Sequence, residues 1–212
     1  MATDDSNRPG GVAGDRRTRL NPTHGGPRRP LVAAPAPQSP DRPDISITRV
    51  ERGYRLVAVQ RIPRPREEVF PFFADAFNLE AITPRSLRFQ ILTPPPIVMS
   101  RETIIDYRLR IRGVPVRWRT EITSWSPPRR FVDEQRRGPY RRWVHEHTFE
   151  AVPGPGGEET IMRDQVDYAL PGGPLVHRLF VANDLRRIFT TRFERVAAHF
   201  AAPAAACEDA TR

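Results

Sequence analysis

The segment GPYRRWVHEHTFE, residues 138–150, is the most informative stretch of this chain. A Gly-Pro turn precedes a run whose side chains would alternate between two faces of a β-strand. One face would carry Trp143, His145, His147 and Phe149. A fully buried core would normally have Val, Ile or Leu in place of the two imidazoles. The pattern therefore predicts that this strand forms one wall of a ligand cavity.

Charge and cysteine content limit the cellular setting. The chain has 212 residues, a net charge of +9 and 34 basic residues, all of them arginine. The arginines alternate with acidic and apolar residues, so we expect solvated outer faces and no nucleic-acid patch. The one cysteine, Cys207, can form no intramolecular disulfide, which is compatible with a reducing compartment. No apolar run approaches the ~20 residues that span a bilayer, and no signal-peptide core is present. We therefore expect a cytoplasmic protein.

Composition divides the chain into three regions. Residues 1–48 are rich in Pro, Gly, Asp and Arg, so we expect a disordered tail. Residues 49–200 contain the periodic apolar segments of one domain. Residues 201–212 form an Ala-rich end that we expect to be flexible.

The apolar periodicity predicts an α+β domain. Seven strands are expected, at residues 54–62, 87–92, 102–111, 114–125, 130–136, 141–150 and 160–170. Short connections with turn residues between the last six predict an antiparallel meander. Two short helices are expected between the first two strands, one opening at Pro65 and one capped by Asp75.

A long amphipathic helix should follow the sheet. From Pro174 to about Phe200, apolar residues recur every three to four positions, and this stripe is long enough to lie across the whole sheet. Four arginines fall mostly off the stripe and are expected to face solvent: Arg178, Arg187, Arg192 and Arg195.

This order of elements resembles the helix-grip fold of the START and SRPBCC superfamily. The strings FADAFNLEAITP, TIIDYRLRIRGVPVRWRTEI and RDQVDYALPGGPLVHRLF are similar to those of a bacterial subfamily of polyketide cyclase-like and coenzyme-Q-binding proteins. The resemblance covers about residues 54–200. It implies a curved antiparallel sheet of about seven strands that grips the C-terminal helix around a hydrophobic cavity. One departure is Ser100-Arg101-Glu102, where a glycine-containing turn would be expected.

The concave face of such a sheet should be largely apolar and aromatic. Strand alternation assigns to it Tyr107, Leu109, Trp118, Thr120, Phe131, Gln135, Trp143, His145, His147, Phe149 and Tyr168. Such a lining fits a small hydrophobic ligand, for example a lipid, a quinone, an isoprenoid or a polyketide. The same aromatic side chains would serve equally well as core packing against the helix.

Catalysis is a second possibility for the same face. Asp133 or Asp164 on a neighbouring strand could orient His145 or His147 as a general base, as an aromatase/cyclase or dehydratase reaction requires. The resemblance supplies no catalytic motif to carry over. Binding or carriage demands less of the site and is our first hypothesis. A third is an arginine-rich surface module that associates with anionic membrane or nucleic acid.

Metal and cofactor sites are not expected. Two imidazoles on one strand face can share an ion, but no third ligand stands at a recognisable spacing. Asp133, Asp164 or Glu146 could serve as one only if the fold brings it close. The chain has no Walker loop, dinucleotide fingerprint or nucleophile elbow. We expect a small hydrophobic ligand as partner, with no specific nucleic acid. Peripheral membrane contact, a monomer and a homodimer are all compatible with the sequence.

Overall fold

A computed structural model describes residues 43–201, so most of the predicted tail and nearly all of the predicted C-terminal end lie outside the described residues. The described part is α+β, with one antiparallel sheet and a long C-terminal helix, as predicted. Within residues 43–201, no helix is long and apolar enough to cross a membrane.

The sheet has eight strands, one more than the sequence indicated. They are β1 (Asp44–Val50), β2 (Gly53–Ile62), β3 (Gln90–Ile91), β4 (Ile104–Ile111), β5 (Val114–Ser126), β6 (Arg130–Arg137), β7 (Arg142–Gly154) and β8 (Gly157–Ala169). Their order across the sheet is β1-β2-β8-β7-β6-β5-β4-β3, and all neighbours are antiparallel. The strands from β3 to β8 form the predicted meander. The last of them, β8, pairs with β2 on its other side.

The additional strand, β1, corrects the predicted boundary of the tail. Its residues pair one to one with β2, from Asp44 opposite Val59 to Val50 opposite Gly53. Residues 44–48, which composition places in the tail, therefore belong to the sheet. The segment DISITRV alternates polar and apolar residues from Asp44 to Thr48, and as an edge strand it leaves all its side chains exposed or half-buried.

The loop before β4 also differs from the expectation. The predicted strand at 87–92 is reduced to β3 and a 3₁₀ turn, η1 (Arg85–Leu87). The next strand begins at Ile104, two residues later than predicted. Glu102 has a φ of 70°, so a non-glycine residue adopts the left-handed conformation at the place where a glycine turn was expected.

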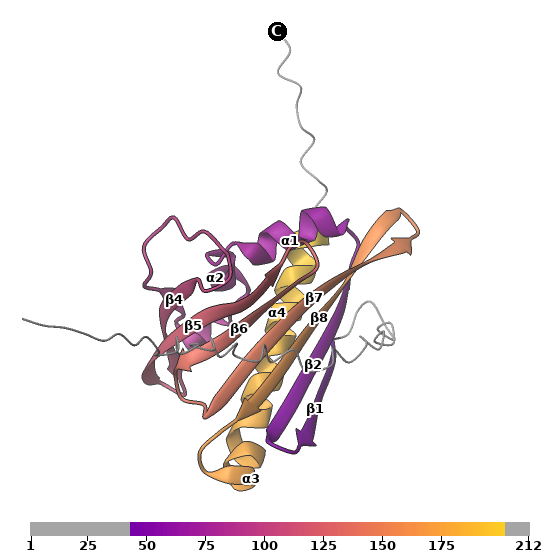
Figure 1. The fold of residues 1–212 in the computed structure, drawn as a ribbon. Coiled ribbons are helices and arrows are strands. Elements are labelled where there is room, and N and C mark those ends of the chain that lie inside the picture. The colour runs from indigo at the N-terminus through magenta and orange to yellow at the C-terminus, as the bar shows by residue number, and fades with distance from the viewer. Residues whose placement is uncertain (1–42, 202–212) are drawn as a thin grey trace, which may run out of the picture. The chain divides into compact units, whose positions relative to one another are not determined.

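Two short helices, α1 (Arg66–Ala74) and α2 (Asn78–Ile82), follow β2 as predicted. The predicted cap was wrong, because Asp75 ends α1 and Phe77 is the N-cap of α2. The C-terminal helical run is continuous and consists of α3 (Gly173–Val176), a π-helical turn η2 (His177–Val181) and α4 (Ala182–Ala201). The sequence predicted one helix here but not the π turn. Figure 1 shows α4 lying across the sheet, with α1 at its C-terminal end, where the rings of Phe72 and Phe200 lie 5.4 Å apart.

Two groups of buried side chains fix the helix on the sheet. The first joins α1 to β7 and to the C-terminal end of α4, through residues such as Phe70, Phe149 and Val196. The second joins β2 and β8 to the N-terminal half of α4, through residues such as Leu56 and Leu185.

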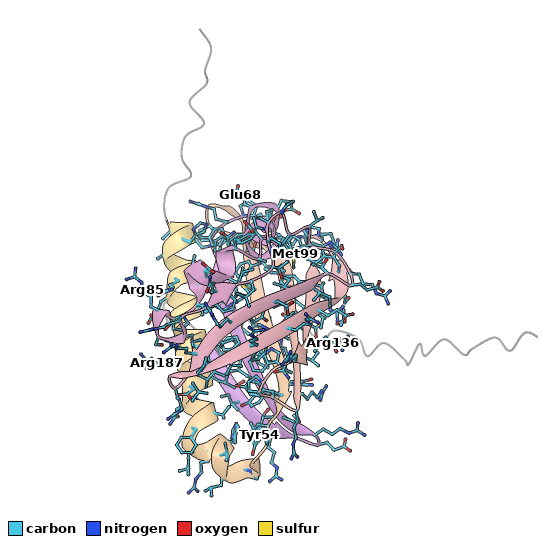
Figure 2. All side chains as sticks on the ribbon, turned by 90° about the vertical axis from the view of Figure 1, so that its left-hand side faces the viewer. Tyr54, Glu68, Arg85, Met99, Arg136 and Arg187 are labelled. Atoms are coloured by element: carbon cyan, nitrogen blue, oxygen red, sulfur yellow. The ribbon has the colours of Figure 1, made fainter. Side chains whose placement is uncertain are left out.

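The other face of the sheet is polar. Arginines pair there with acidic residues of neighbouring strands, as in Arg119–Asp106 at 2.8 Å and Arg136–Glu121 at 2.7 Å. Figure 2 shows Arg136 on the strands, away from α4. This arrangement agrees with the expected solvated outer face.

Candidate functional site

A cavity of about 460 Å³ lies between the inner face of the sheet and the C-terminal helix. Its wall comes from α1, α2, the strands β4 to β7 and α4. Most of the wall is apolar, with contributions from Phe73, Ile82 and Leu185. The volume falls within the range of small-molecule sites in proteins.

Most of the predicted ligand-contact residues line this cavity. They are Tyr107, Leu109, Trp118, Thr120, Phe131, Trp143, His145 and His147, and Asp133 joins them. The alternation of β4, β5 and β7 brings them to one face, because every second residue of these strands points inward.

Three predicted residues lie outside the cavity wall, each for a local reason. The side-chain amide of Gln135 donates to the carbonyl of Tyr140 at 2.7 Å and accepts from its N–H at 3.3 Å, so it shapes the β6–β7 turn. Phe149 packs in the core against Phe70, with ring centroids 5.3 Å apart. Tyr168 is fully buried and its hydroxyl is bonded to His177.

One part of the cavity wall carries hydroxyl groups among aromatic rings. The hydroxyl of Tyr107 is hydrogen-bonded to Thr120, and the indole N–H of Trp118 donates to Thr120 Oγ1 at 3.1 Å. Burial, reinforced by the charge of Asp133, raises the pKa of Tyr107, so its hydroxyl stays neutral. This region therefore offers neutral hydrogen-bonding groups to a ligand oxygen.

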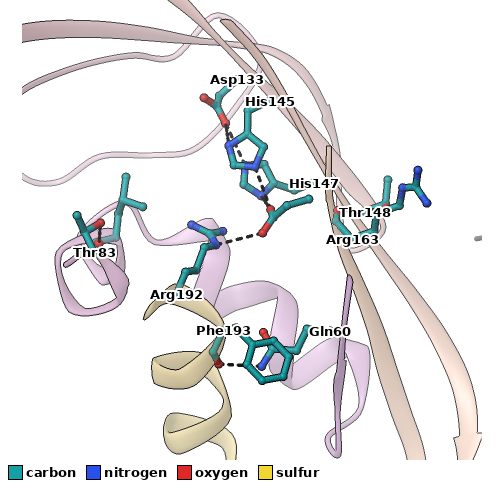
Figure 3. Close-up of polar contacts among 11 residues, drawn as sticks. Gln60, Thr83, Asp133, His145, His147, Thr148, Arg163, Arg192 and Phe193 are labelled. Carbon is teal, nitrogen blue, oxygen red and sulfur yellow. Dashed lines mark hydrogen bonds and ion pairs between the residues drawn. The ribbon is translucent and has the colours of Figure 1, made fainter. Parts of the chain in front are cut away.

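A buried charged cluster, which we call the His–Asp cluster, lies at another part of the wall: Asp133, His145, His147, Asp164 and Arg192. All but Asp164 line the cavity. Three adjacent strands position its histidines and carboxylates, since Asp133 lies opposite His145 and His147 lies opposite Asp164, while Arg192 comes from α4. The two imidazole rings lie with their centroids 3.8 Å apart and their planes tilted by 35°. Figure 3 shows the rings between Asp133 on one side and the carboxylate that meets Arg192 on the other.

Both imidazoles face carboxylates on two sides. Asp164 Oδ1 lies 3.0 Å from His145 Nε2 and 2.7 Å from His147 Nδ1. Asp133 Oδ2 lies 3.0 Å from His147 Nε2 and 3.6 Å from His145 Nδ1. The Nε2 of each ring is hydrogen-bonded, His145 with Asp164 and His147 with Asp133. His147 Nδ1 lies close to Asp164 without hydrogen-bond geometry, and the distance from His145 Nδ1 to Asp133 is too long for a hydrogen bond.

The electrostatics match this geometry. Burial lowers the pKa of His147, but the charge of Asp164 and the hydrogen bond with Asp133 outweigh it and raise that pKa above its usual value. Burial, together with the charge of His147, lowers the pKa of His145. The two opposite shifts favour a proton on His147 over a proton on His145.

Arg192 is the member that sequence reasoning missed. Its Nε lies 3.2 Å from Asp164 Oδ2, and the residue is 9% exposed. Although burial opposes it, the charges of Arg192 and His147 hold the pKa of Asp164 well below its usual range. A signal was present, because Arg192 stands three residues after Phe189 and four before Val196, on the buried stripe of α4.

The expectation of solvent exposure was also wrong for Arg195, which donates to the carbonyls of Ala81 and Thr83 at 2.8 and 2.7 Å. Arg178 and Arg187 are exposed, as expected, and Arg187 lines the cavity.

The tip of the β4–β5 hairpin closes against the helix beside the cavity. Arg112 and Gly113 have φ angles of 51° and 84°, as a tight hairpin turn requires. The Arg112 guanidinium forms two contacts with Asp184, at 2.8 and 3.1 Å, and lies 4.8 Å from the centre of the Phe180 ring. Arg112 and Asp184 both line the cavity, so this ion pair forms part of its rim.

Solved structures of other proteins share this fold. A Thermus thermophilus protein has 20% identity and a TM-score of 0.54, covering 70% of this chain and 97% of its own. An Arthrobacter aurescens protein has 13% identity and a TM-score of 0.56, covering 79% and 97%. The major latex-like protein 151 of Panax ginseng has 12% identity and a TM-score of 0.51, covering 69% and 96%. At these identities the likeness concerns the fold alone.

Sequence comparison gives a more specific result. The profile of a family described as polyketide cyclase/dehydrase and lipid transport matches residues 54–201. A search of curated proteins gave no match.

Proposed function

Because the chain belongs to the polyketide cyclase/dehydrase and lipid transport family, we propose that it binds or carries a small hydrophobic molecule with polar oxygen atoms. Lipids, quinones, isoprenoids and polyketides are of this kind. The observation that carries the proposal is the cavity itself: a mostly apolar wall that contains two separate hydrogen-bonding regions.

The wall supports a ligand of mixed character. Rings such as Trp118 and Trp143, whose centroids lie 5.4 Å apart in an edge-to-face arrangement, offer contact area to an apolar body. Thr120 and Tyr107 can hydrogen-bond one oxygen, and His145 Nδ1, which makes only the 3.6 Å contact with Asp133, can accept from a hydroxyl of the ligand. Apolar area would give affinity, and the placed polar groups would select among ligands of similar size.

The test begins with native mass spectrometry of protein purified from its own host, followed by extraction and a binding panel of lipids, quinones and polyketides. Leu109→Trp would place a larger side chain in the cavity, and we expect it to weaken binding by about tenfold or more. Leu175→Trp is the matched control, since Leu175 is 62% exposed and away from the cavity wall. Absence of any bound molecule, or equal binding by the two variants, would contradict the proposal.

A cyclase or dehydratase reaction is a second candidate, which one observation favours. His145 is held neutral and lines the cavity, and its Nδ1 makes only the 3.6 Å contact with Asp133. A neutral imidazole nitrogen of this kind can remove a proton from the carbon between two carbonyl groups.

This candidate predicts turnover of a poly-keto thioester by the wild-type protein. His145→Asn should lose turnover while still binding the substrate. His177→Asn, which alters a buried histidine outside the cavity wall, should retain it. Substrate binding without product formation by the wild type would leave carriage as the function.

A further inference from the structure

The two histidines of the His–Asp cluster converge on one oxygen of Asp133. His147 Nε2 and His145 Nδ1 lie 3.0 and 3.6 Å from Asp133 Oδ2. One ligand atom from each of the three residues lies within 4.8 Å of the other two. Around a tetrahedral ion with bonds of about 2.1 Å, ligand atoms stand about 3.4 Å apart. The observed spacing therefore needs only small side-chain adjustments to enclose an ion.

The opposite edges of the two rings meet a second carboxylate. His145 Nε2 and His147 Nδ1 lie 3.0 and 2.7 Å from Asp164 Oδ1, while Arg192 holds the other oxygen of Asp164 at 3.2 Å. When His145 donates from Nε2 to Asp164, the lone pair of its Nδ1 points to the side of Asp133. His147 Nδ1 lies close to the same Asp164 oxygen without hydrogen-bond geometry, so a small rotation of this ring would let it donate there and free Nε2 for an ion. Metal-binding histidines are held in this way, with the non-ligating nitrogen donating to a carboxylate.

We propose that Asp133, His145 and His147 bind one divalent transition-metal ion at the cavity wall, with Asp164 as the positioning residue. Two imidazoles and one carboxylate form a ligand set suited to zinc and to ferrous iron. All three ligands line the cavity, so a fourth position is open to water or to an oxygen of a bound molecule.

Sequence spacing could not select this site, because Asp133, one of three acidic residues that could supply the third ligand, is distant along the chain from the histidines. Asp133 stands on β6, and the β6–β7 hairpin places it opposite His145. The second carboxylate comes from β8 and its anchoring arginine from α4. No short motif connects these positions, and only the register of three strands reveals the ligand set.

Metal binding and proton transfer make competing use of His145 Nδ1. In the proposed site this nitrogen is a ligand, so the loaded protein has no free imidazole base at that position. The metal site does not depend on a bound organic molecule, and the two proposals can therefore fail separately.

The test uses the full-length protein without a histidine tag, stripped with a chelator and titrated with Zn²⁺ by calorimetry. We expect one Zn²⁺ per chain with a Kd of about 1 µM or tighter. Replacement by Co²⁺ should give visible absorption bands from an ion with nitrogen and oxygen ligands. A wild-type protein that binds neither ion stoichiometrically would overturn the proposal. The imidazole rings would then hold only protons between the two carboxylates.

Variants locate the ion. Asp133→Asn should weaken Zn²⁺ binding at least 100-fold while circular dichroism shows an intact fold. Asp164→Asn should keep the stoichiometry but weaken binding by about 10- to 100-fold, as loss of an orienting carboxylate usually does. His199→Gln is the control, because His199 is exposed on α4 and should leave binding unchanged. Binding that survives Asp133→Asn, or that disappears in His199→Gln, would place the ion elsewhere and contradict the proposal.

Discussion

Two buried histidine sites in this protein have opposite surroundings. In the His–Asp cluster, His147 lies between the carboxylates of Asp133 and Asp164. At the start of η2, His177 lies instead among phenol groups. Its ring stacks on Tyr54 with centroids 3.4 Å apart, and its Nε2 lies 2.8 Å from the hydroxyl of Tyr168.

The difference shows that burial alone does not decide the charge of a histidine. Burial lowers the pKa of His177, and the nearby charge of Arg186 lowers it further, so this imidazole is kept neutral. His147 is more deeply buried, yet its two carboxylate neighbours raise its pKa. One site favours a bound cation, whether a proton or a metal ion, and the other opposes it.

Among the variants that test the contrast between the two histidine sites, Asp164→Asn is expected to cause the largest loss in the free energy of unfolding. The substitution leaves the buried Arg192 guanidinium without its carboxylate and removes a charge that both imidazoles face. Breaking a buried ion pair in this way costs about 3–5 kcal/mol. Chemical denaturation followed by circular dichroism would measure the loss in free energy of unfolding.

Asp167→Asn is the matched control on the same strand. Asp167 pairs with Arg55 on the outer face of the sheet, at 2.6 and 2.9 Å, but the Arg55 side chain is 40% exposed. Pairs of this kind contribute about 1 kcal/mol or less. Equal losses of stability in the two variants would mean that the ion pairs of the His–Asp cluster contribute no more than an exposed ion pair. The proposed difference between the two histidine sites would then be contradicted.

The fold was largely predictable because its signals are local. The meander can be predicted from the polar–apolar alternation within strands such as β4 and β5 and from the short turns between them. The long helix can be predicted from the apolar periodicity of α4. The strand β1 was missed because composition grouped it with the preceding region rich in Pro, Gly, Asp and Arg, and its alternation over Asp44 to Thr48 is only five residues long. The π turn at His177–Val181 was missed because its residues fit an ordinary helix equally well.

The site was predictable only in part. Residues on the inward positions of the strands, such as Trp118 and His145, follow from alternation. The roles of Gln135 and Tyr168 could not be predicted from alternation, because they depend on hydrogen bonds to the backbone of Tyr140 and to the ring of His177. The prediction for Arg192 failed because the residue was assigned to solvent from its charge, although its position lies on the apolar stripe of the helix. It is instead buried and paired with Asp164.

A smaller effect, in the pH dependence of stability, would test the neutral histidine. The folded-state pKa of His177 is lowered, so below about pH 6.5 the unfolded chain binds this proton more readily than the folded protein does. The contribution of His177 to stability is therefore intact above that pH and is lost as the pH falls through it, because the charged ring would be buried and would lie near Arg186. His147 acts with the opposite sign, so the informative quantity is the difference in stability between the wild type and His177→Gln, measured by denaturation from pH 8 to pH 5.

We expect the stability of the wild type to fall more steeply than that of His177→Gln below pH 6.5, since only the wild type must accept a proton beside Arg186. Parallel curves would show that His177 is not held neutral, and the contrast between the two histidine sites would then rest on geometry alone.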